Sequence, residues 1–151
     1  MPAELCDVPK GDERSATWNR SGVIVFGSYG GLQKIPSAGG KPAPATKLEN
    51  GENAHRWPWF LPDDEHFLYL AQRSGVSEVR VGLLTSTDTW SLGPFESNVV
   101  YAREHLLFVR GGTLMAQSFD SATRQLAGEP VVLAKLALPT PACGRRRPMQ
   151  S

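Results

Sequence analysis

One serine stands in a setting that could make it a nucleophile. Ser28 is followed by Tyr-Gly-Gly. A serine becomes a nucleophile when a strained strand-to-helix turn exposes its hydroxyl, and such a turn requires glycine two residues before the serine. Phe26 occupies that position, and residues 32–35 form a strand-like run that ends at a proline. The pattern therefore predicts a glycine-rich hairpin turn in which Ser28 is not catalytic.

Acidic and histidine side chains are the other candidates for chemistry. Residues 63–65 are three consecutive carboxylates, and consecutive turn residues point apart instead of converging on a metal ion. We expect Asp63 to accept hydrogen bonds from backbone N–H groups of its own turn. His55, His66 and His105 lack metal-ligand spacing. His66 and His105 each precede an apolar run directly, so we expect a shared structural role and no metal or other cofactor.

Trp57, Pro58, Trp59 and Phe60 form the densest aromatic cluster. Strand alternation would send Trp57 and Trp59 to one face and Phe60 to the other. The first interpretation is core packing between structural units, and the second is an aromatic surface on which a partner docks. Trp57 and Trp59 are therefore the candidate partner-binding residues, and we expect no catalytic residue.

Charge and composition exclude several partners. The 151 residues carry 16 basic and 15 acidic side chains, and this balance argues against nucleic acid or an anionic membrane as a partner. The two cysteines lie near opposite ends and predict neither a disulfide framework nor a zinc site. No apolar run has the length of a membrane span, and the first residues do not form a signal peptide. The chain is expected to be cytoplasmic as it stands, and extracytoplasmic if it is attached to a membrane-anchored protein.

A plan of elements recurs about every 40 residues. Each unit has an aromatic residue, a four-residue apolar run, a glycine-containing turn, a second strand and a polar third segment. The aromatic residues are Trp18, Phe60 and Tyr101. The apolar runs are residues 23–26, 67–70 and 106–109, the second strands are residues 32–35, 79–83 and 114–119, and the third segments are residues 45–48, 89–92 and 130–133. This period and strand number are typical of β-propeller blades.

The expected fold is all-β: a β-propeller fragment of about three four-stranded antiparallel blades that form an incomplete ring. The blades are expected at about 15–53, 54–97 and 98–138. Residues 1–14 resemble the end of a preceding blade, and residues 139–151, with Arg145, Arg146 and Arg147, are expected to form a disordered basic tail. The competing fold is a plain antiparallel sandwich.

The turn before the second apolar run resembles the WD40-like repeat of the PD40, or TolB, type. That repeat has an aromatic residue, then Ser-Pro-Asp-Gly, then an apolar strand. Here Phe60 and Pro62-Asp63 match, whereas Leu61 replaces serine and Asp64 replaces glycine. The resemblance implies a propeller.

A longer resemblance covers roughly residues 4–138. These segments are similar to the C-terminal propeller of bacterial serine/threonine protein kinases of the acidobacterial type: residues 31–36, 38–40, 55–58, 106–110, 112–117 and 128–131. In that family a kinase domain, a membrane span and a propeller follow one another. The resemblance implies a sensor or protein-interaction role, and it carries over no catalytic residue because the chain contains no kinase motif.

The sequence thus predicts a non-catalytic module, a fragment of a larger kinase-linked or TolB-like protein that binds a protein partner or small ligand at the propeller face. The alternative is the propeller portion of a serine hydrolase or peptidase. Three blades leave two blade faces without neighbours, and residues 23–26 and 106–109 are expected to be exposed there. The chain is therefore expected to pair with missing blades of a parent chain or to self-associate.

Overall fold

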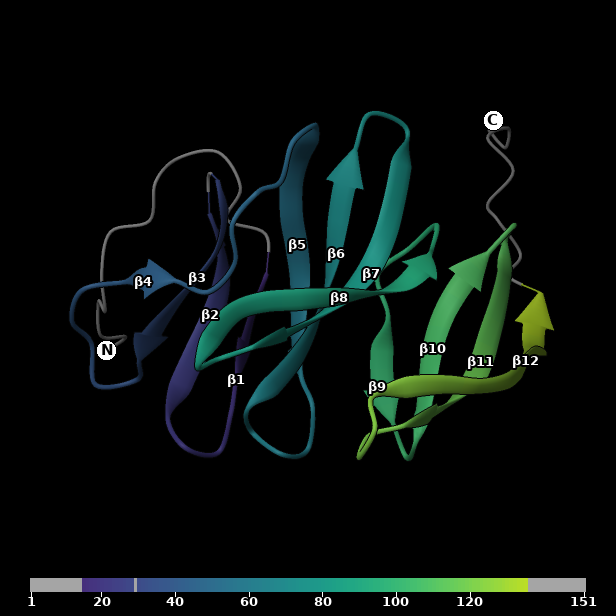
Figure 1. Ribbon diagram of the computed structural model, residues 1–151. Helices are drawn as coiled ribbons and strands as arrows, with labels where there is room; N and C mark the ends of the chain where they lie inside the picture. Colours follow the sequence, from purple (N-terminus) through teal and green to yellow (C-terminus); the bar gives the residue numbers. More distant parts are fainter. Residues whose placement is uncertain (1–14, 29, 136–151) are drawn as a thin grey trace, which may run out of the picture.

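The computed structural model describes residues 15–28 and 30–135, and these residues form strands and turns without a helix (Figure 1). No helix that could cross a membrane is therefore found in these two ranges. Twelve strands are described. They are β1 (Ala16–Trp18), β2 (Val23–Ser28), β3 (Gly31–Pro36), β4 (Ala43–Pro44), β5 (Glu52–Phe60), β6 (His66–Arg73), β7 (Val76–Leu83), β8 (Ser86–Pro94), β9 (Val100–Ala102), β10 (His105–Arg110), β11 (Thr113–Asp120) and β12 (Gln125–Lys135).

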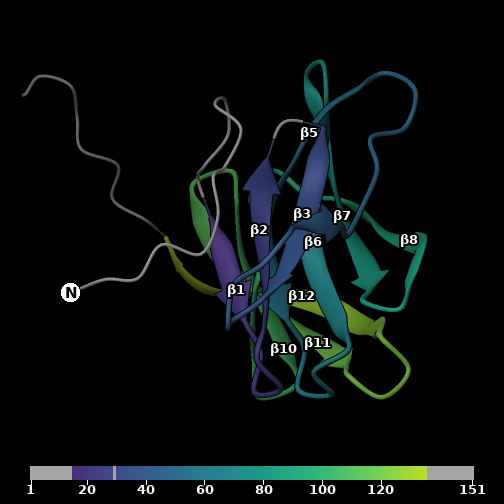
Figure 2. The same ribbon diagram turned by 90° about the vertical axis from the view of Figure 1, so that its left-hand side faces the viewer.

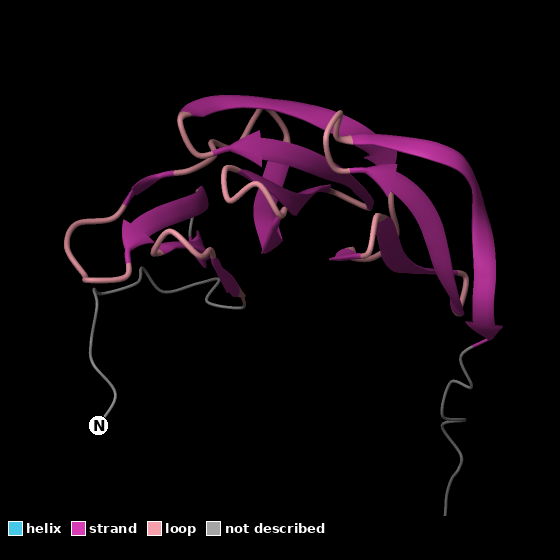
Figure 3. Cartoon of the chain, turned by 90° about the horizontal axis from the view of Figure 1, so that it is seen from below, coloured by secondary structure: helices cyan, strands magenta, loops and turns pink. Residues whose placement is uncertain are grey.

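The strands form three separate antiparallel sheets, each a four-stranded meander in chain order. The first sheet holds β1–β4, the second β5–β8 and the third β9–β12. Seen from below, the three sheets follow one another along an arc that does not close (Figure 3). The predicted fold class of three four-stranded blades in an incomplete ring is therefore confirmed. The segments 1–14 and 139–151, with the predicted blade end and basic tail, lie outside the described residues.

The core lies between the sheets, and the central strands of the second sheet, β6 and β7, are buried on both faces. Along β6, Phe67 and Tyr69 belong to a cluster with Val25 and Leu32 of the first sheet. The alternate residues of β6, such as Leu70, belong to a second cluster that includes Phe108 of the third sheet. A continuous apolar run is what such a doubly buried strand requires.

The turn at residues 61–65 has the predicted chemistry. One carboxylate oxygen of Asp63 accepts hydrogen bonds from the backbone N–H groups of Glu65 and His66, both at 2.9 Å. This turn also joins the first two sheets, because the Asn19 side-chain amide donates to the Asp64 carbonyl at 2.8 Å. The Arg20 guanidinium forms an ion pair with Asp64 at 3.3 Å.

The predicted third segment of the first sheet is wrong in position. The edge strand β4 comprises Ala43 and Pro44, not residues 45–48. Ala45 and Thr46 both donate their backbone N–H to the Leu32 carbonyl, at 2.8 and 3.1 Å, and both side chains are buried. The edge strand therefore ends at Pro44, and the next two residues turn inward to the core.

The expected exposure of the two terminal apolar runs is wrong for half of their residues. Val25, Leu106 and Phe108 are buried because they face the second sheet. Their strand neighbours Leu107 and Val109 point the other way and are only half-buried. The exposed apolar surface is therefore one row of alternate residues.

Candidate functional site

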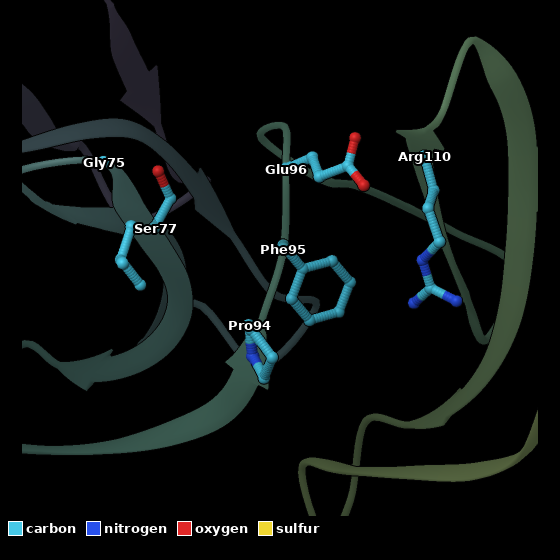
Figure 4. Close-up of a pocket in the computed structure, with 7 residues that line it drawn as sticks. Gly75, Ser77, Pro94, Phe95, Glu96 and Arg110 are labelled. Carbon is cyan, nitrogen blue, oxygen red and sulfur yellow. The ribbon is translucent and has the colours of Figure 1, made fainter.

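A cleft of about 520 Å³ opens between the second and third sheets (Figure 4). Three separate stretches line it: residues 75–77, at the hairpin from β6 to β7; residues 94–96, which lead from β8 to β9; and Arg110, at the end of β10. The cleft forms where two sheets diverge at their hairpin ends, so only their side-by-side packing creates it.

Phe95 fixes one wall of the cleft. Its backbone N–H donates to the Ser77 carbonyl at 3.1 Å, which holds the β8–β9 connection against β7. Its ring packs edge-on against Phe108 with centroids 4.9 Å apart, and the residue is buried. The wall is therefore rigid and apolar, which suits a preformed binding site.

The cleft also contains two side chains of opposite charge, Glu96 and Arg110. The Glu96 carboxylate accepts a hydrogen bond from the Gly111 backbone N–H at 3.1 Å. The Arg110 guanidinium lies over the Phe108 ring, 5.3 Å from its centroid, and makes no ion pair with any described carboxylate. Both side chains extend into the space beside Phe95 (Figure 4). Arg110 is thus a positioned cation with donors available for an anionic group.

A smaller hollow of about 190 Å³ shares Val76, Ser77 and Pro94 with the cleft and adds Arg73 and Glu78. The β6–β7 hairpin therefore borders a second hollow, and charged side chains line that hollow too.

A buried polar network lies between the first and second sheets. The Thr46 hydroxyl is 2.7 Å from Nδ1 of His55, and Nε2 of His55 is 2.8 Å from a Glu52 carboxylate oxygen. A carboxylate only accepts, so Nε2 carries the proton. Burial lowers the pKa of His55, so the ring is neutral and Nδ1 accepts from the Thr46 hydroxyl.

The order hydroxyl, imidazole, carboxylate is that of a catalytic triad, but its location is not. The His55 and Glu52 side chains are 0 % exposed, and the Thr46 oxygen already accepts a hydrogen bond from the Leu32 N–H at 2.9 Å. A substrate cannot reach a nucleophile placed there. The network therefore joins the first and second sheets.

Arg80 completes this network from β7. Its guanidinium pairs with Glu52 and Glu78, and with Glu49 at 3.4 Å. Burial disfavours the charge of Arg80, but hydrogen bonds to Glu78 and Tyr69 and the charge of Glu52 outweigh this effect, so the pKa of Arg80 is raised. Burial likewise opposes ionisation of Glu52, yet hydrogen bonds from Glu49 and His55 and the nearby Arg80 lower its pKa. The two buried ions, Arg80 and Glu52, are therefore paired with each other.

No family model matches the chain, and none of the curated proteins matches it. Among solved structures, the chain is similar to the calcium-binding protein regucalcin from Agrobacterium tumefaciens, with a TM-score of 0.57 and 14 % identity over 78 % of this chain. Regucalcin is a β-propeller protein. The chain has a β-propeller fold. The match covers 43 % of the regucalcin chain, so the three sheets are propeller blades that correspond to less than half of that protein.

Fold similarity at this level of identity transfers no activity. Within the described residues, no three His, Cys, Asp or Glu side chains gather as ligands of a metal ion would.

The two tryptophans predicted to bind a partner differ in their exposure. A bulge between Arg56 and Trp59 interrupts the pairing of β5, and Trp57 has a φ of 58°. Trp57 packs against the cluster between the second and third blades, whereas Trp59 is 39 % exposed. Trp59 pairs with Leu68 of that same cluster, and Phe60 packs against the cluster between the first and second blades. The two tryptophans therefore lie on one face and Phe60 on the other, as predicted, and the role of Trp57 and Trp59 in binding a partner stays a prediction.

The other candidates from the sequence lie at a hairpin and at the starts of strands. The Ser28 hydroxyl donates to the Gly31 carbonyl at 2.9 Å, and Ser28 pairs with Gly31 across the β2–β3 hairpin, as predicted. His66 and His105 begin β6 and β10, so their positions are equivalent, as predicted. Trp18 is 66 % exposed, whereas Phe60 and Tyr101 pack against the apolar clusters between blades.

Proposed function

We propose that this propeller segment is a non-catalytic binding module, and that the cleft between the second and third blades is its binding site. The observation that carries the proposal is Arg110, a cation fixed over Phe108 at the cleft with no carboxylate partner among the described residues. An unpaired guanidinium at the rim of a preformed cleft recognises a carboxylate or a similar anionic group.

The remaining lining residues define the rest of the ligand. Phe95 and Pro94 offer an apolar wall, and Glu96 can accept a hydrogen bond from an amide or amine. A ligand with one carboxylate, a small apolar part and a neighbouring N–H group matches this arrangement. The carboxyl terminus or an acidic side chain of a protein partner has all three, which agrees with the protein-interaction role expected from the sequence.

Two observations support the absence of catalysis in this proposal. The Thr46–His55–Glu52 group is closed to solvent, and Ser28 is buried and donates its hydroxyl hydrogen to a carbonyl. A serine hydrolase needs an accessible nucleophile beside a base. We therefore favour a binding module over the propeller portion of a hydrolase.

The resemblance to kinase-linked propellers supports a finer proposal about the protein to which this segment belongs. It is carried by segments such as residues 31–36, 55–58 and 106–110. In a kinase-linked protein, occupation of the cleft would be the sensed event, and the other blades of the ring would come from outside the described residues.

The test is a titration of the isotope-labelled chain with short peptides that end in a free carboxylate, followed by nuclear magnetic resonance. We expect the amide signals of Gly75, Ser77 and Gly111 to shift. Arg110→Gln removes the charge and should weaken binding by about tenfold to a hundredfold, since a charge-assisted hydrogen bond contributes about 1.5–3 kcal/mol.

Arg103→Gln is the matched control, because Arg103 lies in the β9–β10 turn outside the cleft lining; it should bind like the unchanged chain. Peptides with an amidated carboxyl terminus should bind as weakly as peptides do to Arg110→Gln. Equal binding by Arg110→Gln and Arg103→Gln would refute the proposed site.

A further inference from the structure

Arg73 and Arg110 occupy the same position in successive blades. Each is the last residue of its blade's second strand, β6 or β10, and each pairs across a hairpin with the first residue of the next strand. Ala71 and Phe108 precede them by two residues, so they lie on the same faces of their strands. Both belong to apolar clusters shared with the preceding blade. Each arginine therefore stands at the hairpin end of a junction between two blades.

The connections that lead into the second and third blades also begin alike. Ala45 donates its backbone N–H to the carbonyl of Leu32, the second residue of β3, at 2.8 Å. Phe95 donates its backbone N–H to the carbonyl of Ser77, the second residue of β7, at 3.1 Å. Ala45 and Phe95 are therefore equivalent points, each fixed against the preceding blade.

The connection into the second blade is the longer of the two. Residues 46–51 stand between Ala45 and Glu52, and Glu52 pairs with Arg73 across β5 and β6. Figure 2 shows this connection as a wide loop that leads from β4 into the upper end of β5. The end of the loop therefore lies beside Arg73.

Arg73 binds two acceptors of this loop. Its Nη1 donates to the Asn50 carbonyl at 2.9 Å, and its Nη2 lies 3.7 Å from a carboxylate oxygen of Glu52. These acceptors belong to one tight turn, because the Glu52 N–H donates to the Glu49 carbonyl at 3.0 Å. Gly51, the third residue of the turn, has the positive φ, 84°, that this place in a turn favours. Arg73 thus holds a main-chain carbonyl and a carboxylate two residues apart.

The connection into the third blade is too short to contain such a turn. The β9–β10 register, continued beyond its last pair, places Ser97 opposite Arg110, so only Glu96 stands between Phe95 and this position. The Ser97 hydroxyl accepts from the Val109 N–H at 2.9 Å. Neither Ser97 nor Glu96 supplies Arg110 with the acceptors that Arg73 has. The place of the turn is left as part of the cleft (Figure 4).

We propose that the ligand of this cleft is a turn of a partner protein that carries an acidic side chain, and that it binds Arg110 as residues 49–52 bind Arg73. A guanidinium has separate N–H donors for a main-chain carbonyl and for a carboxylate. The proposal rests on the function proposed for the cleft, and it assigns the carboxylate to a side chain within a turn and not to a free carboxyl terminus.

The test is a nuclear magnetic resonance titration of the isotope-labelled chain with a peptide that copies residues 48–53 and has both ends blocked. Asn-Gly at its centre favours the turn. We expect the peptide to shift the amide signals of Ser77 and Gly111. The peptide with Glu52→Gln should bind at least about tenfold more weakly, since it loses a charge-assisted hydrogen bond.

The matched control is the peptide with Glu49→Gln, which has the same net charge as the peptide with Glu52→Gln. It should bind like the unchanged peptide, because the Glu49 side chain does not contact Arg73 in the loop. In the chain, Arg110→Gln should abolish the shifts and Arg103→Gln should preserve them.

Equal weakening by the two peptide substitutions would show attraction by net charge alone and would overturn the proposal. So would the absence of binding by the blocked peptide while peptides with a free carboxyl terminus still bind through Arg110, a result that leaves the proposed function standing. If neither kind of peptide binds, the proposed function and the acidic turn both fail.

Discussion

Arg80 shows how single residues join the blades. It stands between Val79 and Val81 in the run 79–83, which is otherwise apolar, and its neighbours in space are the carboxylates of Glu52 and Glu78. A cation inside an apolar run is a sequence signal for a buried ion pair, and Glu52 and His55 have the spacing of a local contact. The sequence could not show that Thr46, from the preceding blade, completes the group.

The buried network makes stability depend on pH. Burial lowers the pKa of His55 in the folded chain, whereas the unfolded chain has a histidine pKa of about 6.5. Above that pH both states are neutral and His55 adds no pH dependence. Below it the unfolded state binds a proton that the folded state does not, so the free energy of unfolding falls as the pH falls.

We expect this slope to approach about 1.4 kcal/mol per pH unit below pH 6.5. Glu52 adds a further loss at lower pH, because its pKa is lowered in the folded chain and the unfolded carboxylate takes up its proton first. Urea titrations between neutral and acidic pH measure both effects. In His55→Gln the pH dependence of the free energy of unfolding just below pH 6.5 should disappear. An unchanged dependence would show that His55 does not cause it.

Among the elements, the central strands were predictable and the inner strand β5 was not. Residues 67–70 and 79–83 lie within β6 and β7 as expected, because an apolar run between turns needs no distant information. The bulge in β5 depends on the first blade: the Ser15 hydroxyl accepts from the Trp57 N–H at 2.9 Å, and the Thr17 hydroxyl accepts from the Phe60 N–H at 3.2 Å. These oxygens replace the lost strand partners, and no local pattern encodes them.

The pairing of β6 and β7 contains one position that admits only glycine. Gly82 lies opposite Phe67, and a Cβ atom at Gly82 would be 2.6 Å from the Phe67 ring. Phe67 is fully buried, so its ring cannot move aside. We expect Gly82→Ala to destabilise the fold by about 1–3 kcal/mol through overpacking, measured by chemical denaturation.

The matching control is the same substitution in a Phe67→Leu background, where the ring is absent. The cost of Gly82→Ala should be much smaller there, and the difference between the two costs measures the clash directly. Equal costs in both backgrounds would place the origin of the effect elsewhere than at Phe67.

At the scale of the whole molecule, the sequence predicted the repeat but not the cleft. The repeat is visible because each blade repeats one set of strand signals. The cleft draws Ser77, Phe95 and Arg110 from three elements on two blades, and each of these residues is ordinary in its own segment. Their convergence depends on how the second and third blades diverge, which is a property of packing.

In the propeller arrangement, the second blade uses alternate residues of β6 to contact its two neighbours, the first and the third blade. A nuclear Overhauser spectrum of the methyl-labelled chain tests this directly. We predict cross-peaks from the Tyr69 ring to methyl groups of Val25 or Leu32, and from the Phe108 ring to methyl groups of Leu68 or Leu70. Cross-peaks between the Tyr69 and Phe108 rings would mean that the first and third sheets share one core, as in a sandwich, and would contradict the propeller.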